Sequence, residues 1–133
     1  MHMPRIVAFV CLHGSAKSLI AAEYLNGLAR ERKLDLSATT SGPEPDLEVP
    51  PNVLDGLTLR GIDARARVPA PVTAAALARA DYIVSFGCDL GGLAPPGSAI
   101  ERWDDCPAVS DDFDIAWSYI SAQVERLLER LAA

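Results

Sequence analysis

Apolar and polar positions follow two different spacings along the chain, and their alternation predicts strands that are followed by helices. Short segments with strand character occupy residues 6–11, 36–40, 81–86 and 99–102. The first and third are nearly continuous apolar runs, which is typical of strands buried on both faces. Helical spacing occupies residues 18–32, a segment from Pro50 or Pro51 to Gly61, residues 73–79 and residues 113–131.

This order of elements predicts one α/β domain that spans residues 1–133. We expect a three-layer structure, in which a four-stranded parallel sheet in the flavodoxin-like order 2-1-3-4 carries helices on both faces. Such sheets bind ligands beyond the carboxyl ends of their strands. Cys11 ends the first strand and Cys88 follows the third, so both are expected at this edge, where they can be neighbours. Residues 103–112 follow the fourth strand and are expected to overhang the same edge.

The sequence between the first strand and the first helix, C-L-H-G-S-A-K-S over residues 11–18, predicts an anion-binding loop. Backbone N–H groups of a tight loop that enters a helix N-terminus have no partners of their own, so they can hydrogen-bond an oxyanion. The positive end of the helix dipole adds to this attraction. A cysteine at the mouth of such a loop is expected to be partly thiolate, and hence nucleophilic, at neutral pH.

Two interpretations of Cys11 are open from the residues alone, since most cysteines in apolar runs are buried and inert. Its neighbours favour the nucleophile. Gly14 permits close backbone approach, Lys17 supplies positive charge, and Ser18 can donate its hydroxyl to a thiolate while capping the helix. The nucleotide-binding loop G-x-x-x-x-G-K-[ST] is excluded by spacing, because the glycine that it needs before Gly14 is absent.

Charge and cysteine content restrict the partners and the compartment. A formal net charge of −6 and a pI near 4.8 argue against nonspecific binding to nucleic acid or anionic membranes, because both need a basic surface. The three cysteines are widely separated, which predicts neither a disulfide framework nor a structural zinc site and favours a reducing, cytoplasmic location. No apolar stretch reaches the length of about 18 residues that a membrane span needs.

These residues resemble a known family. C-L-H-G-S-A-K-S followed by L-I-A-A-E-Y-L is similar to the phosphate loop and first helix of the low-molecular-weight protein tyrosine phosphatases and of the thioredoxin-coupled arsenate reductases that share their fold. Further along the chain, T-S-G-P-E-P resembles the family's S-A-G-T-x-P segment, and V-S-F-G-C-D resembles the reductases' V-T-x-G-C-G-D. The resemblance extends from Arg5 to Leu131, which is essentially the whole chain.

The resemblance implies roles for individual residues, with Cys11 as the nucleophile. The oxyanion would be held by the residues that follow it: Leu12, His13, Gly14, Ser15, Ala16, Lys17 and Ser18. Lys17 stands where the family has an arginine, which keeps the positive charge but loses the planar fork that holds two oxygens. Cys106 stands where the family has the general-acid aspartate before a proline, so Asp105 is our first candidate for the proton donor and Asp104 the second. No metal or organic cofactor is implied.

The resemblance is compatible with three functions. The first is hydrolysis of a phosphate monoester through a cysteinyl-phosphate intermediate, with Cys11, Lys17, Ser18 and Asp105 as catalytic residues. The second is arsenate reduction, in which Cys88 attacks the adduct on Cys11 and a thioredoxin-like protein or a low-molecular-weight thiol reduces the disulfide. The third is a weak or inactive module that binds phosphate or another oxyanion. The expected partners are phosphate, arsenate or a phosphorylated substrate, and we expect a monomer or a weak dimer.

Cys88 and Cys106 also have a passive interpretation. Cys88 can be a small residue that fills the turn after a buried strand. The third cysteine of the reductases, expected a few residues after Cys88, is missing, and Cys106 could replace it only if the late loop folds over the site.

Overall fold

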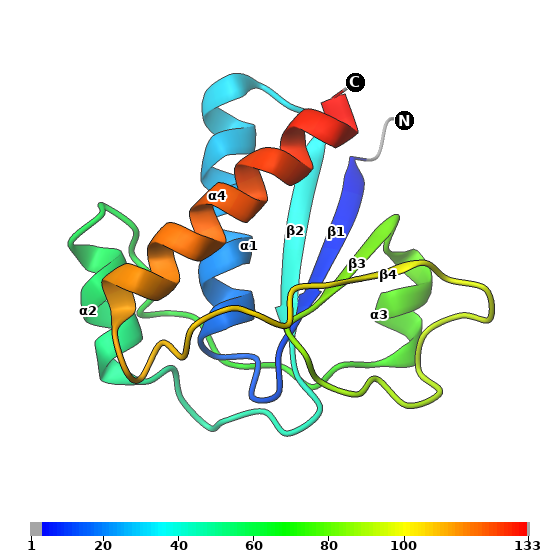
Figure 1. Cartoon of the computed structure of the whole chain (residues 1–133), viewed down its shortest axis with the longest axis horizontal. Helices are drawn as coiled ribbons and strands as arrows, with labels where there is room; N and C mark the ends of the chain where they lie inside the picture. The colour runs from blue at the N-terminus through cyan, green and yellow to red at the C-terminus, as the bar shows by residue number, and fades with distance from the viewer. Residues whose placement is uncertain (1–3, 133) are drawn as a thin grey trace.

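The computed structural model describes residues 4–132, and its elements follow the predicted order (Figure 1). The strands are β1 (Arg5–Val10), β2 (Leu36–Ser41), β3 (Tyr82–Ser85) and β4 (Ile100–Arg102). The helices are α1 (Lys17–Arg32), α2 (Pro51–Thr58), α3 (Ala74–Arg79) and α4 (Phe113–Ala132). Residues 1–3 and 133 of the predicted domain lie outside the described residues.

All four strands are parallel and lie in the predicted order, β2-β1-β3-β4. β1 is central, because Val10 lies opposite Ser41 of β2 on one side and opposite Ser85 of β3 on the other. The chain adds β2 on one side of β1 and β3 on the other, so the direction of strand addition reverses at β1. Sheets of this kind bind ligands at such a reversal. The loops after β1, β2 and β3 gather at the lower end of the molecule in Figure 1, whereas the two termini lie at the upper end.

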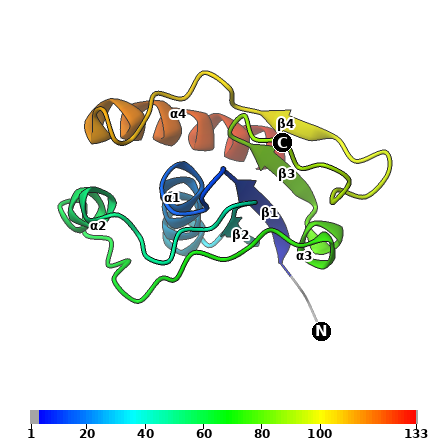
Figure 2. The same cartoon turned by 90° about the horizontal axis from the view of Figure 1, so that it is seen from below.

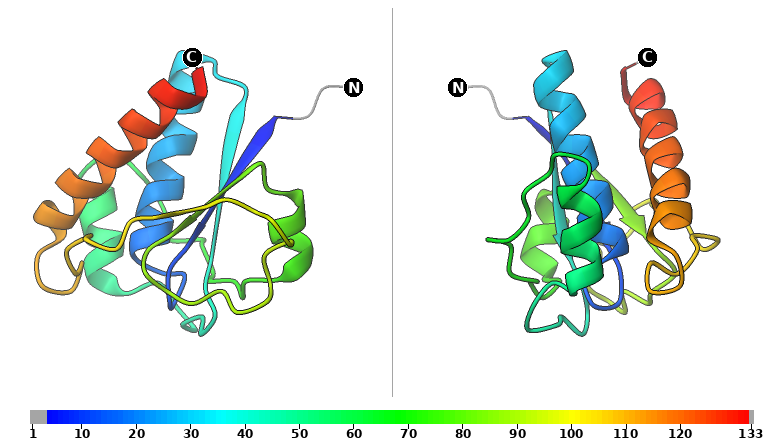
Figure 3. Two further views of the ribbon diagram at one scale, coloured as in Figure 1. Left: turned by 45° about the vertical axis from the view of Figure 1, so that its right-hand side comes forward. Right: turned by 90° about the vertical axis from the view of Figure 1, so that its left-hand side faces the viewer.

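The two faces of the sheet carry different helices. Figures 2 and 3 show α1 and α4 on one side of the sheet and α3 on the other. Side chains alternate along β1, so Val7 and Phe9 join the larger core cluster, which α1, α2 and α4 enclose. Ala8 and Val10 join a smaller cluster with Leu77 of α3. The three layers predicted from the sequence are confirmed.

α4 buries one apolar side, which includes Ile120, Val124 and Leu127, and also holds the short strand β4. Near its C-terminal end, Arg130 donates two hydrogen bonds of 2.8 Å to the carboxylate of Glu101, which also accepts from Trp103 Nε1 at 2.6 Å. The bond from Arg130 holds the pKa of Glu101 below its usual value, although burial opposes it. These bonds attach the beginning of the segment that follows β4 to the core. Within residues 4–132, no helix has both the length and the apolar character to cross a bilayer.

α1 begins at Lys17, one residue earlier than the spacing predicted, and this changes the role of Ser18. Ala16 occupies the N-cap position, where no side chain makes a capping hydrogen bond. Ser18 lies inside the first turn and does not cap the helix, so that part of the prediction is wrong. Thr73 does cap α3, because its hydroxyl oxygen accepts from Ala76 N at 3.1 Å.

Candidate active site

Residues 11–18, called the anion loop below, connect the end of β1 to the first turn of α1. Gly14 has a φ of +60°, and its N–H donates to Cys11 O at 3.2 Å, so the loop folds back on itself. Within residues 4–132, several N–H groups of this loop have no protein acceptor: those of Leu12, His13, Ser15, Ala16 and Lys17. Unpaired N–H groups at the start of a helix are donors for an anion.

The sulfur of Cys11 is held by Ser18. Ser18 N donates to Cys11 Sγ at 3.4 Å, and Ser18 Oγ lies 3.0 Å from the same sulfur. Thr40 Oγ1, at the end of β2, lies 2.7 Å from Ser18 Oγ, so Thr40 can donate to Ser18 while Ser18 donates to the sulfur. A thiolate accepts both of these bonds, so the geometry suits a nucleophilic sulfur.

The segment after β2, residues 42–46, supports the anion loop and is called the support segment below. Glu44 N donates to Leu12 O at 2.9 Å, and Asp46 N donates to His13 O at 3.2 Å. The hydroxyl of Ser15, which is buried, donates to Asp46 Oδ2 at 2.6 Å. The first two bonds pair carbonyl oxygens of the loop with N–H groups of the support segment, and the third fixes the Ser15 side chain.

A cavity of about 330 Å³ lies next to the anion loop, with Cys11 and Lys17 in its wall. The apolar part of the wall comes from several elements: Leu12, Ala16, Pro50, Val53, Phe86, Ala108 and Val109. The polar part consists of His13, Ser15, Asp46, Asn52 and Ser110. Asn52 Nδ2 donates to Val109 O at 3.3 Å, which attaches the segment before α4 to α2. A positive, N–H-rich end and an apolar wall are features of a site for an organic anion.

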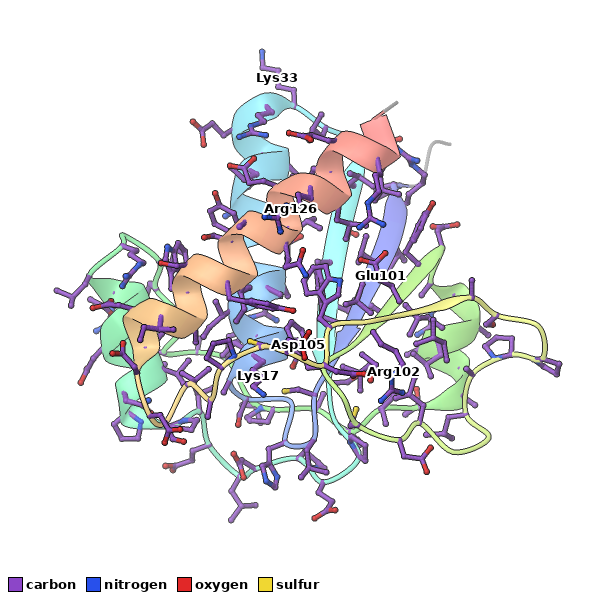
Figure 4. All side chains as sticks on the ribbon, viewed as in Figure 1. Lys17, Lys33, Glu101, Arg102, Asp105 and Arg126 are labelled. Carbon is purple, nitrogen blue, oxygen red and sulfur yellow. The ribbon has the colours of Figure 1, made fainter. Side chains whose placement is uncertain are left out.

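The structure does not bring Asp105 into this cavity. Asp105 is exposed on the segment between β4 and α4, where Figure 4 labels it. Asp104 is exposed as well, and its Oδ2 pairs with Arg102 Nε at 3.2 Å. Among the described residues, the carboxylate in the cavity wall is that of Asp46 and not one of the two predicted proton donors.

Cys88 lies at the predicted edge of the sheet, but its side chain belongs to the face opposite that of Cys11. Its sulfur lies 3.6 Å from Ser85 Oγ and 3.8 Å from Val10 O, inside the cluster that α3 covers. The two cysteine side chains therefore lie on opposite faces of the sheet, in separate core clusters. The reason is the alternation along β1, which directs Val10 and Cys11 to opposite faces.

Cys106 lies on the same side of the sheet as Cys11. It is 7% exposed and belongs to the same core cluster, together with Trp103. Burial raises the pKa of the Cys106 thiol from 9.0 to about 11, while the charge of Lys17 lowers it and that of Cys11 raises it. Ala108 and Val109, which follow Cys106 in the chain, line the cavity together with Cys11, so the late loop folds over the site.

Two residues of the site, Gly42 and Asp46, were not identified from the sequence. A Cβ on Gly42 would lie 2.7 Å from Leu12 O, so only glycine lets the support segment approach the anion loop this closely. The register of the sheet carries a signal for this contact. Ser41 ends β2 opposite Val10 of β1, so the residues that follow the two strands must leave the sheet side by side.

The sequence of the chain is similar to that of one protein family. The sequence model of the low molecular weight phosphotyrosine protein phosphatases matches residues 6–91. This range contains the anion loop, the support segment and Cys88. A comparison with curated protein sequences finds no match.

Solved structures with the same fold include both phosphatases and arsenate reductases. A thioredoxin-dependent arsenate reductase from Corynebacterium glutamicum has a TM-score of 0.80 and 24% identity over 98% of this chain, which spans 64% of that reductase's length. A low molecular weight phosphotyrosine phosphatase from Vibrio cholerae O395 has a TM-score of 0.83 and 16% identity, with coverage of 96% of this chain and 97% of its own. An arsenate reductase in the phosphate binding state has a TM-score of 0.76 and 20% identity, with coverage of 95% and 98%. At these identities the likeness is one of fold.

Proposed function

Because the chain belongs to the low molecular weight phosphotyrosine protein phosphatase family, we propose that it hydrolyses phosphate monoesters through a cysteinyl-phosphate intermediate. The observation that carries this proposal is the environment of Cys11. Its sulfur accepts from Ser18 N at 3.4 Å and lies 3.0 Å from Ser18 Oγ, at the start of a helix and beside unpaired N–H groups. A sulfur held in this way is suited to attack a phosphate that the same N–H groups bind.

In the proposed mechanism, the Cys11 thiolate attacks phosphorus in line with the departing oxygen. The N–H groups of the anion loop hold the equatorial oxygens, and the ammonium of Lys17 neutralises part of their charge. The ammonium of lysine is a compact charge, whereas the planar guanidinium of arginine can donate to two oxygens at once. We therefore expect slower turnover than an arginine at this position would give. Water then hydrolyses the cysteinyl phosphate and restores the thiolate.

The position of the acidic residues limits which leaving groups, and therefore which substrates, we expect the site to accept. Asp105 is exposed and does not line the cavity, so the leaving oxygen has no carboxylic acid from residues 103–112 beside it. Leaving groups that depart as stable anions need no such acid. Val53, Phe86 and Val109 offer an apolar surface to an aromatic ring. We therefore propose aryl phosphates with acidic leaving groups as the substrate class.

Turnover of p-nitrophenyl phosphate by wild type, Cys11→Ser and Lys17→Arg tests the proposal. Wild type is expected to act above background and Cys11→Ser at background. Lys17→Arg is expected to raise kcat/KM by about tenfold, because a guanidinium can hold two oxygens of the transition state at once.

Background rates for all three proteins, together with a melting temperature that phosphate still raises, would contradict the proposed hydrolysis. That pair of results would identify the chain as an oxyanion-binding module, the third function that the sequence suggested. The same assay in buffer without a thiol reductant also shows whether activity depends on keeping Cys11 reduced.

A second candidate function is arsenate reduction, and the presence of a second thiol on the same side of the sheet as Cys11 favours it. In this function Cys11 attacks arsenate, another cysteine releases arsenite, and a thioredoxin-like protein or a low-molecular-weight thiol reduces the disulfide. Arsenite release from arsenate in the presence of such a reductant measures it. A Cys11→Ser variant that releases as much arsenite as wild type would remove this candidate.

A further inference from the structure

The site contains a second thiol that the proposed hydrolysis does not use. Cys106 is buried in the core cluster that contains Cys11, on the face of the sheet covered by α1 and α4. Cys88 is buried in the opposite cluster, where its sulfur lies 3.8 Å from Val10 O. Of the other two cysteines, Cys106 is therefore the one on the same side of the sheet as Cys11.

The segment that carries Cys106 is part of the wall of the cavity. Ala108 and Val109, which follow it closely in the chain, line the cavity together with Cys11. The hydrogen bond of 3.3 Å from Asn52 Nδ2 to Val109 O attaches this segment to α2. Figures 1 and 3 show the segment crossing the N-terminal end of α1, where the anion loop lies. Cys106 is thus held on an anchored piece of chain, whose residues Ala108 and Val109 share the cavity wall with the loop.

The state of the Cys106 thiol suits a site that binds anions. Its pKa of about 11 keeps it protonated at neutral pH, so it adds no negative charge beside an incoming oxyanion. The charges of Lys17 and Cys11 act on its pKa in opposite directions and are weaker influences than burial. Because the thiolate is the attacking species in such exchanges, Cys106 must lose its proton as it attacks the sulfur of Cys11, once that sulfur has become electrophilic.

We propose that Cys106 is the resolving thiol of Cys11: it attacks Cys11 Sγ after a two-electron oxidant, arsenate or a hydroperoxide, has reacted there, and the two cysteines form a disulfide. The proposal rests on the nucleophilic role proposed for Cys11. It assigns to Cys106 the step that the sequence comparison with the reductases suggested for Cys88.

With arsenate, the Cys11 thiolate forms a sulfur–arsenic bond, and one arsenate oxygen takes up protons and leaves as water. Cys106 then attacks Cys11 Sγ, and the sulfur–arsenic bond breaks with its electron pair moving to arsenic. Arsenite leaves with the thiol proton. Arsenic gains two electrons, and the two sulfurs lose two in forming their bond.

With a hydroperoxide, the Cys11 thiolate takes up one oxygen atom as a sulfenic acid, while water or an alcohol leaves. Cys106 attacks the sulfur of this sulfenic acid, and its hydroxyl departs with the thiol proton as water. Both oxidants therefore lead to the same disulfide, which an external dithiol reduces to two thiols.

The experiment maps the disulfide in wild type, Cys106→Ser and Cys88→Ser, with Cys88→Ser as the matched control. Each reduced protein is treated with two equivalents of hydrogen peroxide or with excess arsenate. Free thiols are then blocked with N-ethylmaleimide, and the unreduced protein is digested and analysed by mass spectrometry. Melting temperatures establish that each variant is folded.

We expect a Cys11–Cys106 disulfide within single chains of wild type and Cys88→Ser. In Cys106→Ser we expect no intramolecular disulfide, and peroxide should drive Cys11 on to sulfinic acid. A Cys11–Cys88 disulfide in wild type would overturn the proposal, and so would the absence of any intramolecular disulfide in wild type with both oxidants. Neither result depends on whether a variant folds. Arsenite release that Cys106→Ser retains in full would overturn it too.

The results with the two oxidants distinguish a role of Cys106 in arsenate reduction from a role in protecting Cys11 against oxidation. A Cys11–Cys106 disulfide with both oxidants, accompanied by arsenite, assigns Cys106 to a reductase cycle. The same disulfide with peroxide alone assigns it to oxidative protection of the nucleophile. If the disulfide forms while p-nitrophenyl phosphate is not turned over, the proposed hydrolysis fails and the role of Cys106 stands.

Discussion

Gly14 of the anion loop and Gly42 of the support segment lie in backbone contact with each other. A Cβ on Gly42 would lie 2.5 Å from Gly14 N, and a Cβ on Gly14 would lie 2.8 Å from Gly42 N. Real Cβ atoms do not approach backbone atoms so closely, and backbone cannot move aside as the end of a flexible side chain can. The shape of the anion loop therefore depends on glycine in two segments that are far apart in the sequence.

Gly42→Ala is expected to abolish most of the catalytic activity. The new methyl group must push the support segment away from the loop, which we expect to lower the free energy of unfolding by about 1–3 kcal/mol, as overpacking does. Urea unfolding and p-nitrophenyl phosphate turnover measure the two effects. Gly27→Ala is the control, because a Cβ there meets no atom within 4 Å and alanine favours the helix. Equal behaviour of the two variants would contradict the close contact at Gly42.

Asp46→Ala is expected to lower kcat/KM for the same substrate by about tenfold or more. It removes the acceptor of the buried Ser15 hydroxyl, and an unsatisfied buried donor costs about 1–3 kcal/mol. Asp46→Asn keeps a side-chain oxygen and should lose less activity. Glu48→Ala, at an exposed position two residues further along, serves as the control and should behave as wild type. A similar fall in kcat/KM for Glu48→Ala would show that removal of a negative charge near the loop lowers the activity, and not the loss of the bond to Ser15.

Cys106 should make the protein less stable as the solution becomes alkaline. Its pKa is raised from 9.0 to about 11 by burial, so between these values the unfolded chain releases a proton that the folded chain keeps. Unfolding is therefore favoured as pH rises, by roughly 1.4 kcal/mol for each pKa unit, or about 3 kcal/mol over the whole interval. Urea unfolding at pH 8 to 11 should show a smaller alkaline loss for Cys106→Ala than for wild type. Equal losses would mean that the Cys106 thiol ionises as readily when folded as when unfolded.

Asp105→Asn is expected to change kcat for p-nitrophenyl phosphate by less than about threefold. The carboxyl is exposed and does not line the cavity, whereas a general acid in contact with the leaving group contributes a factor of about 100 to 10,000. The pH profile of kcat/KM should likewise keep its shape in this variant. A hundredfold fall in kcat would instead establish Asp105 as the proton donor that the family resemblance suggested.

The predictable part of this molecule is the part that depends on periodicity. Strands, helices and sheet order follow from apolar spacing, because burial of a sheet between helices requires those patterns, and the C-L-H-G-S-A-K-S segment forms a loop between β1 and α1 as predicted. Helix ends were less predictable. Ser18 has the side chain of a capping residue, but its hydroxyl bonds to Cys11 and Thr40, so the helix starts at Lys17.

The positions of Cys88 and Cys106 show why the rest could not be predicted. Both follow strands, in irregular segments without a period that would reveal which face their side chains join. Packing decides the outcome: Cys88 fills the small cluster under α3, and Cys106 joins Trp103 in the large one. For the same reason the sequence did not reveal that Asp105 lies outside the cavity wall, since it directly precedes Cys106 in the chain and yet is exposed where Cys106 is buried.

The pH 7 rate at which iodoacetamide alkylates Cys11, with and without orthovanadate, tests most directly whether the anion loop holds a nucleophilic sulfur. Peptide mapping separates Cys11 from Cys88 and Cys106, and the unfolded protein gives the reference rate for an ordinary thiol. We predict that Cys11 in the folded protein reacts faster than this reference and that orthovanadate protects it. A folded-state rate no higher than the reference, together with no protection by orthovanadate, would contradict the nucleophilic role of Cys11.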